Sequence, residues 1–145
     1  MTPSEFNAAW LAWQRECPSL WRVPRLGGTR CVTIGPLICT PHGFEAQSLG
    51  WQYSQLAHEM AHVRQYMRCG FGNPWLGIPV FLLCYLLVPL PIGLAWFRYH
   101  WEREAFAAEE AARQVAGFSP RRDIPALLSG SAYGWSWPRR WIRGL

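Results

Sequence analysis

The sequence predicts a mostly helical α+β domain, and three observations lead to this prediction. The chain has 145 residues, of which half are hydrophobic and only 16% are charged, a composition typical of a globular domain with its own core. Three long segments have the apolar spacing or the end signals of helices. β-branched residues gather in one short region, residues 30–40. No internal repeat is visible, so we expect one domain over residues 1–145.

The first expected element is an amphipathic helix over residues 4–16, which ends before Pro18. Its aromatic side chains recur at spacings of four and three: Phe6, Trp10 and Trp13. Residues 30–40 then read RCVTIGPLICT and predict two short strands or one bent strand. Pro36 restricts this region to an edge or a bulge, so we expect a short antiparallel edge-strand region.

The second long helix is expected over residues 51–68, with Ser48 as its N-cap and Gly70 as its C-cap. Its buried stripe is formed by three apolar side chains: Leu56, Met60 and Val63. A third long helix is expected over residues 98–115, and Gly117 closes it. A short helix near residues 124–128 follows.

The segment between the last two long helices, Cys69–Phe97, contains no Asp, Glu, Lys or Arg. A membrane-spanning helix needs about 20 apolar residues, but several prolines and glycines interrupt this segment. The break at Pro89-Leu90-Pro91 favours a short apolar helical hairpin, either buried in the core or inserted into one leaflet of a membrane. Residues 131–145, rich in Trp and Arg, would suit a membrane surface or the closure of the core.

The central helix carries the motif His58-Glu59-Met60-Ala61-His62. Two histidines four residues apart on a helix leave from one face, so both imidazoles can bind one tetrahedral Zn²⁺. Glu59 points to the side, where it is placed to take a proton from a metal-activated water as general base. The segment therefore predicts a zinc site with His58 and His62 as ligands and Glu59 as the catalytic residue.

A catalytic zinc usually has three protein ligands, so one more must come from elsewhere in the chain. Gln65 and Arg68 stand where the metzincin pattern needs a glycine and a histidine, which excludes that arrangement. The remaining candidates for the third ligand are His42, His100, Glu102, Glu104, Glu109 and Glu110.

The motif on its helix resembles the gluzincin metallopeptidases, in which a second helix supplies a Glu ligand. In the CAAX prenyl protease and HtpX-like branch that Glu opens a pattern of Glu, two residues, Ala and Asp. Residues 102–106 here read EREAF and match all but the last position, so the resemblance implies Glu102 as the third ligand and a zincin-like fold. Phe106 replaces the Asp that would orient a ligating His, so another group must take that role. The two motifs are also similar to those of small uncharacterised bacterial metallopeptidases.

Glu104 is the alternative third ligand. It lies about 200° round the helix from Glu102, so only one of the two can face the metal. A single membrane crossing by Cys69–Phe97 would also place Glu102 on the opposite side from the histidines, and two crossings need about 40 residues. We therefore expect this segment not to span a membrane.

The resemblance implies a zinc-dependent peptidase that hydrolyses peptide bonds and binds an extended peptide or protein substrate beside residues 33–38. The alternative is a zinc-binding module without catalysis, used for interaction or membrane association. A DNA-linked protease of the SprT-like kind is disfavoured because a Cys-rich zinc ribbon is missing, and we expect no nucleic-acid partner. Five cysteines without a CxxC pair and the absence of a signal-peptide pattern favour a cytoplasmic protein, with peripheral membrane contact through residues 69–97 and the tail as a second reading.

Overall fold

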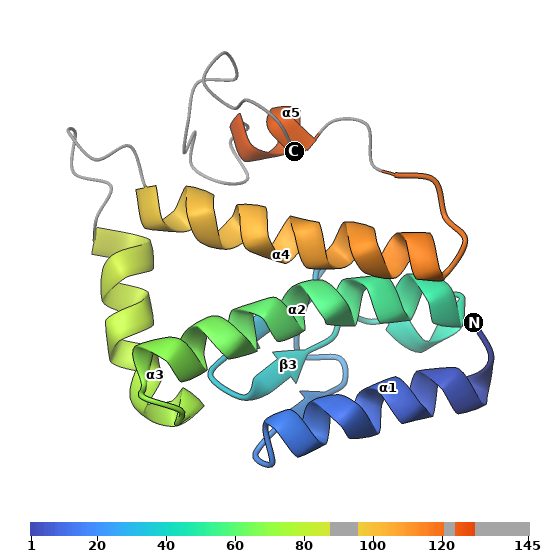
Figure 1. Cartoon of the computed structure of the whole chain (residues 1–145), viewed down its shortest axis with the longest axis horizontal. Helices are drawn as coiled ribbons and strands as arrows, with labels where there is room; N and C mark the ends of the chain where they lie inside the picture. Colours follow the sequence, from blue (N-terminus) through green and yellow to red (C-terminus); the bar gives the residue numbers. More distant parts are fainter. Residues whose placement is uncertain (88–95, 121–123, 130–145) are drawn as a thin grey trace.

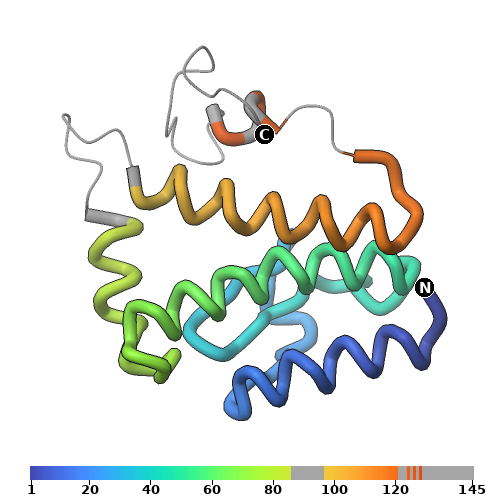
Figure 2. Tube along the Cα trace, in the orientation of Figure 1, coloured from blue at the N-terminus to red at the C-terminus, as the bar shows by residue number. Residues whose placement is uncertain are grey.

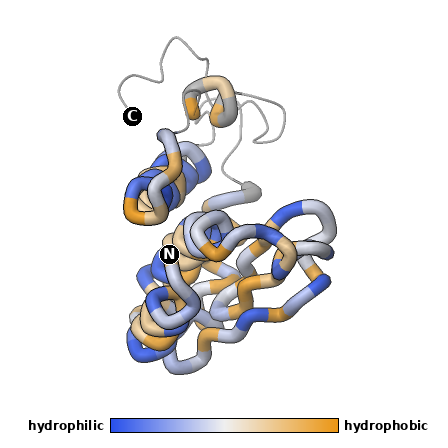
Figure 3. Tube along the Cα trace, turned by 90° about the vertical axis from the view of Figure 1, so that its right-hand side faces the viewer, coloured by the Kyte–Doolittle hydropathy of each residue, from blue (hydrophilic) through white to orange (hydrophobic). Residues whose placement is uncertain are grey.

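The computed structural model describes residues 1–87, 96–120 and 124–129, and it is arranged around one central helix, α2 (Leu49–Cys69). Helix α4 (Trp96–Val115) runs antiparallel along one side of α2, and α1 (Pro3–Glu16) lies on the other side with the sheet (Figure 1). The view from the end shows the same layers, with α2 between α4 and the sheet (Figure 3). Helix α5 (Ile124–Ser129) contacts α4.

Helix α1 begins where the sequence predicts it, and a capping box fixes its start. The Thr2 side chain accepts a hydrogen bond from the Glu5 backbone N–H, and the Glu5 carboxylate accepts one from the Thr2 N–H. Pro3 occupies the first turn, where its missing N–H has no cost. The predicted aromatic stripe of this helix is partly buried against the core.

The sheet contains three short strands in the order β1-β3-β2. Strand β2 (Val32–Ile34) pairs antiparallel with β3 (Leu37–Cys39), which confirms the prediction of two short strands. They are joined by the two-residue loop Gly35-Pro36, in which Gly35 has a φ of 57° as a tight hairpin of this kind requires. Strand β1 (Trp21–Val23) pairs parallel with β3 and was not predicted, because three residues are too few for a period-two pattern.

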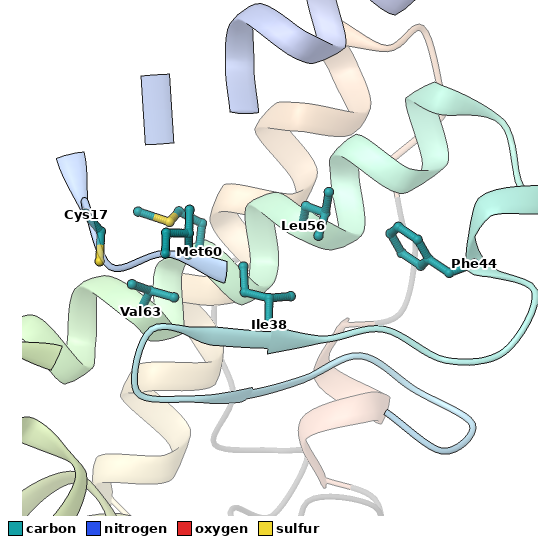
Figure 4. Packing of buried hydrophobic residues seen from close by; sticks show 7 residues of the cluster. Cys17, Ile38, Phe44, Leu56, Met60 and Val63 are labelled. Atoms are coloured by element: carbon teal, nitrogen blue, oxygen red, sulfur yellow. The ribbon is translucent and has the colours of Figure 1, made fainter. Parts of the chain in front are cut away.

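The apolar core lies between α2, α1 and β3 (Figure 4). Its buried side chains are Cys17, Leu20, Ile38, Phe44, Leu56, Met60 and Val63. The stripe predicted for α2 supplies three of them, and these point towards Ile38 of β3 (Figure 4). Each large apolar side chain buried in this way stabilises the fold by about 1.5–3 kcal/mol.

The two long helices predicted at residues 51–68 and 98–115 are present as α2 and α4. The Ser48 side chain caps the start of α2 by accepting a hydrogen bond from the Trp51 N–H. At the other end, the Gly70 N–H donates to the carbonyls of Tyr66 and Met67 and closes the last turn. After α4, Gly117 adopts a φ of 78° and turns the chain away. The tube in Figure 2 follows the chain from α1 through the sheet into α2, and α4 then runs back beside α2.

The apolar segment after α2 forms α3 (Pro74–Leu82) and one π-helical turn, η2 (Leu83–Leu87). Helix α3 crosses α2 at very close range, and Gly77 allows this because a Cβ atom at that position would overlap the Tyr66 carbonyl oxygen. Phe81 on the inner face is buried against Tyr66, with ring centroids 4.0 Å apart.

The outer face of this segment is apolar and exposed. Its exposed side chains are Phe71, Trp75, Leu76, Val80, Leu82 and Leu83. The expected burial of this segment in the core therefore holds for one face of its described part, because α3 crosses over α2 with one side only. The expected return arm falls at residues 88–95, outside the described residues, as does the Trp- and Arg-rich tail. None of the described helices has the length and hydropathy needed to cross a membrane, and contact of this face with a membrane surface stays a prediction.

Candidate metal centre

Three of the predicted site residues meet where α2 faces α4. The Nε2 atom of His58 lies 3.6 Å from Glu102 Oε2, and the Nε2 atom of His62 lies 3.8 Å from Glu102 Oε1. One ligand atom from each residue lies within 4.8 Å of the other two, so the three could hold a metal ion. A tetrahedral zinc site with bonds of about 2.0–2.1 Å has ligand atoms about 3.4 Å apart, close to the observed separations.

The cluster is almost closed to solvent, with side-chain exposures of 11% for each histidine and 4% for Glu102. Within it, Glu102 Oε2 is buried and has no hydrogen-bond partner. A buried carboxylate oxygen without a partner is costly, and such atoms are rare in folded proteins. A cation between the Glu102 carboxylate and the two imidazoles would pair with all three side chains, so the residues present fit a metal ion.

Gln65 fixes the tautomer of His62. Its amide nitrogen lies 2.9 Å from the Trp101 carbonyl and 3.1 Å from the Glu104 carboxylate, and only N–H groups can make both bonds. The Gln65 Oε1 atom must therefore be the atom that faces His62 Nδ1 at 2.8 Å, and it accepts a hydrogen bond from the N–H of that nitrogen. With the proton of the neutral ring on Nδ1, the Nε2 lone pair of His62 is free to bind a metal.

Glu109 takes the corresponding position beside His58. Its Oε2 atom lies 3.3 Å from His58 Nδ1, and its Oε1 atom accepts a hydrogen bond of 2.8 Å from Gln55 Nε2. The His58–Glu109 contact is an ion pair whose alignment is poor for a hydrogen bond, since His58 Nδ1 has no partner by that criterion. Glu109 is buried and lies on the same face of α4 as Glu102, seven residues further on. A carboxylate thus lies beside His58, although position 106 carries a Phe.

The carboxylates determine the charge of the metal-free cluster. Burial by itself lowers the pKa of His58, but its ion pairs with Glu102 and Glu109 and the charge of Glu59 outweigh it and raise that pKa to about 10. For Glu102, burial raises the pKa, but the ion pair with His58, the neighbouring His62 and the hydrogen bond from the Tyr85 hydroxyl lower it below its usual value overall. Without a metal, the cluster is therefore a buried ion pair with a proton on His58.

Glu59 points away from α4 towards the sheet. Its Oε2 atom accepts a hydrogen bond of 2.7 Å from the Thr33 hydroxyl on β2, and the residue is only 7% exposed. The Thr33 carbonyl, on the open edge of β2, accepts a longer bond of 3.3 Å from the hydroxyl of Tyr66. The carboxylate expected to act as base is thus held by the Thr33 hydroxyl of the edge strand β2.

The other candidates for the third ligand lie elsewhere. Glu104 pairs with Arg68 and accepts from Gln65, on a different side of α4 from Glu102. Glu110 pairs with Arg113 on the same helix. His42 is exposed and His100 is half-buried, with its pKa lowered by burial and by Arg103, and neither belongs to the cluster. Of the residues weighed from the sequence, the structure brings together His58, His62 and Glu102, with Glu109 behind His58.

Two residues of the site had no part in the sequence argument. Gln55 supports Glu109, and Tyr85 on η2 donates a hydrogen bond of 2.6 Å to Glu102 Oε1. Gln55 lies three residues before His58, and Gln65 lies three residues after His62. This helical spacing could have indicated that both glutamine side chains lie near the histidines. No pattern in the apolar segment distinguishes Tyr85 from its neighbours.

No protein-family model matches this sequence, and no match was found among curated proteins or solved structures. The argument for a function therefore rests on the chemistry of the site itself.

Proposed function

We propose that the protein is a zinc-dependent peptidase with His58, His62 and Glu102 as the metal ligands and Glu59 as the general base. The observation that carries the proposal is the arrangement around Glu102 Oε2. This buried oxygen has no hydrogen-bond partner and lies 3.6 Å from the Nε2 atom of one histidine of an HExxH motif. The second histidine directs its Nε2 atom towards the same carboxylate, while Gln65 holds its Nδ1 atom.

Zinc is the metal that this set of ligands favours. Two imidazoles and one carboxylate bind zinc in catalytic sites that keep a fourth position for water or substrate. A site for magnesium or calcium would instead be made mostly of oxygen atoms. The gluzincin resemblance of the two motifs points to the same metal.

The chain's own residues supply the remaining chemistry. Zinc, when bound, polarises a substrate carbonyl and lowers the pKa of a water molecule. Glu59 accepts the proton of the attacking water and passes it to the amine that leaves. Thr33 holds one oxygen of Glu59, so the other oxygen is the one that handles the proton. Gln65 and Glu109 hold the two imidazoles through their Nδ1 atoms.

An extended peptide is the substrate that the neighbouring sheet supports. Strand β2 has β3 as its neighbour on one side, so its other edge is open to a further strand. The hairpin register makes Thr33 and Ile38 a non-hydrogen-bonded pair, so the Thr33 carbonyl points to the open edge. The Tyr66 hydroxyl occupies that carbonyl through a bond of 3.3 Å, which an incoming peptide N–H would replace.

A zinc-binding module without catalysis is the second candidate, and the burial of the site favours it. The ligand side chains are no more than 11% exposed, whereas a substrate must reach the metal. Against this candidate, a structural metal site needs neither the Glu59 carboxylate nor the Thr33 hydroxyl that holds it.

Elemental analysis and a protease assay on the same preparations separate these possibilities. We expect about one zinc per chain in the wild type and in Glu59→Gln, and none in His58→Ala or Glu102→Ala. Glu104→Ala is the matched control and should keep its zinc. Gln65 would still donate to the Trp101 carbonyl and so would still hold His62 in place. Cleavage of a casein substrate should fall about 10²–10⁴-fold in Glu59→Gln. Zinc without cleavage in the wild type would favour the inactive module, and a wild type without zinc would contradict both candidates.

A further inference from the structure

The two oxygen atoms of Glu102 have different surroundings. Oε1 accepts a hydrogen bond from the Tyr85 hydroxyl at 2.6 Å, a length typical of strong bonds from a hydroxyl to an ionised carboxylate. Oε2 is buried without a hydrogen-bond partner and faces His58 Nε2 at 3.6 Å. One oxygen is therefore occupied by the protein, and the other is left for a ligand.

Tyr85 is contacted from several sides. The Arg98 guanidinium lies over its ring at 4.6 Å and donates a hydrogen bond of 3.0 Å to its backbone carbonyl. The ring of Phe81 is nearly parallel to it, with centroids 5.4 Å apart. Phe81 in turn stacks on Tyr66 of α2, at the point where Gly77 lets α3 cross closely. The position of the Tyr85 hydroxyl therefore depends on how α3 crosses α2.

A carboxylate can bind a metal through one oxygen or through both. If Glu102 bound through both oxygens, the protein would supply four ligand atoms, two from the carboxylate and one from each histidine. Four ligand atoms fill a tetrahedron and leave no open position. Glu102 Oε1 is close enough for this, because it lies 3.8 Å from His62 Nε2. A hydroxyl that donates to Oε1 takes up one lone pair of that oxygen and draws away its electron density, so it favours metal binding through Oε2 over binding through both oxygens.

We propose that Tyr85 is a positioning residue that makes Glu102 a one-oxygen ligand through Oε2 and so keeps the fourth coordination position open. This inference rests on the proposed metal centre and adds to it the control of coordination number. It assigns a role to the apolar segment between α2 and α4, whose inner face carries Phe81 and Tyr85. The role differs from that of Gln65 and Glu109, which act on the histidines.

The test compares wild type with Tyr85→Phe after loading each with cobalt(II), whose visible absorption is stronger in four-coordinate than in five-coordinate sites. Tyr53→Phe is the matched control, because that ring stacks on Trp13 in a different part of the molecule. X-ray absorption spectra of the zinc-loaded proteins count the oxygen neighbours independently. We expect Tyr85→Phe to stay loaded, with a metal affinity within about 100-fold of wild type, but with weaker cobalt absorption and one more oxygen neighbour. Tyr53→Phe should match the wild type.

Two results would overturn the assignment of Tyr85. One is a Tyr85→Phe protein that is fully loaded and has the wild-type spectrum, since the oxygens would then need no such control. The other is a loss of affinity of more than about 100-fold, which would make Tyr85 a simple support for the ligand. A wild type that takes up neither cobalt nor zinc is a distinct result, because it would contradict the metal centre itself.

Discussion

The two buried faces of α2 are composed in opposite ways. The face towards α1 and the sheet is apolar, with Leu56 and Met60 fully buried. The face towards α4 carries His58 and His62, which are only 9% and 8% exposed as whole residues, opposite two carboxylates. Polar and apolar residues of one helix are therefore buried to nearly the same extent.

This difference separates what stabilises the fold from what the site is for. Burying apolar side chains stabilises the protein, whereas burying charged groups costs free energy that their pairing only partly offsets. Well-packed apolar residues on the α4 face would stabilise the helix pair at least as well. The polar groups are instead arranged around one point, and buried titratable groups with shifted pKa values are typical of functional sites.

The largest expected effect concerns the apolar face. Leu56→Ala removes a fully buried side chain and leaves a cavity, so we expect the free energy of unfolding to fall by about 2–5 kcal/mol. Metal content should stay near that of wild type under conditions where the variant is folded, because Leu56 contacts none of the ligands across the helix. Denaturant unfolding of the metal-free proteins measures the change.

Leu11→Ala is the control for this prediction, because that side chain is 56% exposed on α1 and its loss should change stability by less than about 0.5 kcal/mol. A change below about 1 kcal/mol for Leu56→Ala would break the comparison, since the apolar face would then contribute no more than the surface does.

A smaller effect is expected on the polar face, where Glu109→Gln keeps the shape of the side chain but removes its charge. We expect zinc affinity to fall by about 10–100-fold, which corresponds to about 1.4–2.8 kcal/mol, because Glu109 no longer orients and polarises His58. Competition with a chelator of known affinity measures it. Glu110→Gln on the same helix should leave the affinity unchanged, since Glu110 pairs with Arg113. Equal affinities for wild type and Glu109→Gln would show that the buried carboxylate has no role in metal binding.

Much of this comparison could be predicted from the sequence, because it depends on local patterns. The caps at Ser48 and Gly70, the stripe of Leu56 and Met60, and the facing histidines all follow from helical spacing. The choice of Glu102 over Glu104 needed the family resemblance, because both faces of α4 looked alike in sequence.

The parts that could not be predicted depend on contacts between distant segments. Thr33 reaches Glu59 from a strand 26 residues earlier, and Tyr85 reaches Glu102 only because α3 crosses α2 where Gly77 has no side chain. Strand β1 exists because β3 offers it a partner, not because its three residues have a strong strand pattern. Such contacts are set by packing, which has no local signature.

The finest test of the polar face is the pH dependence of metal binding. The pKa of His58 is raised to about 10 in the metal-free protein, above the value of about 6.5 for an unperturbed histidine. Its proton therefore stabilises the metal-free fold fully below about pH 6.5, and that contribution is lost as the pH rises towards 10. A metal must displace this proton, so zinc affinity should rise by up to about tenfold per pH unit between pH 7 and pH 9.

Calorimetry in buffers of different ionisation enthalpy should then find about one proton released per metal at pH 7.5. Glu109→Gln should release less, because removing one carboxylate lets the pKa of His58 fall towards neutrality. A zinc affinity that does not change between pH 7 and pH 9 would mean that His58 is already neutral there. The carboxylates opposite α2 would then not control the protonation of the histidines. The face of α2 towards α4 would differ from the apolar face in composition but not in metal chemistry.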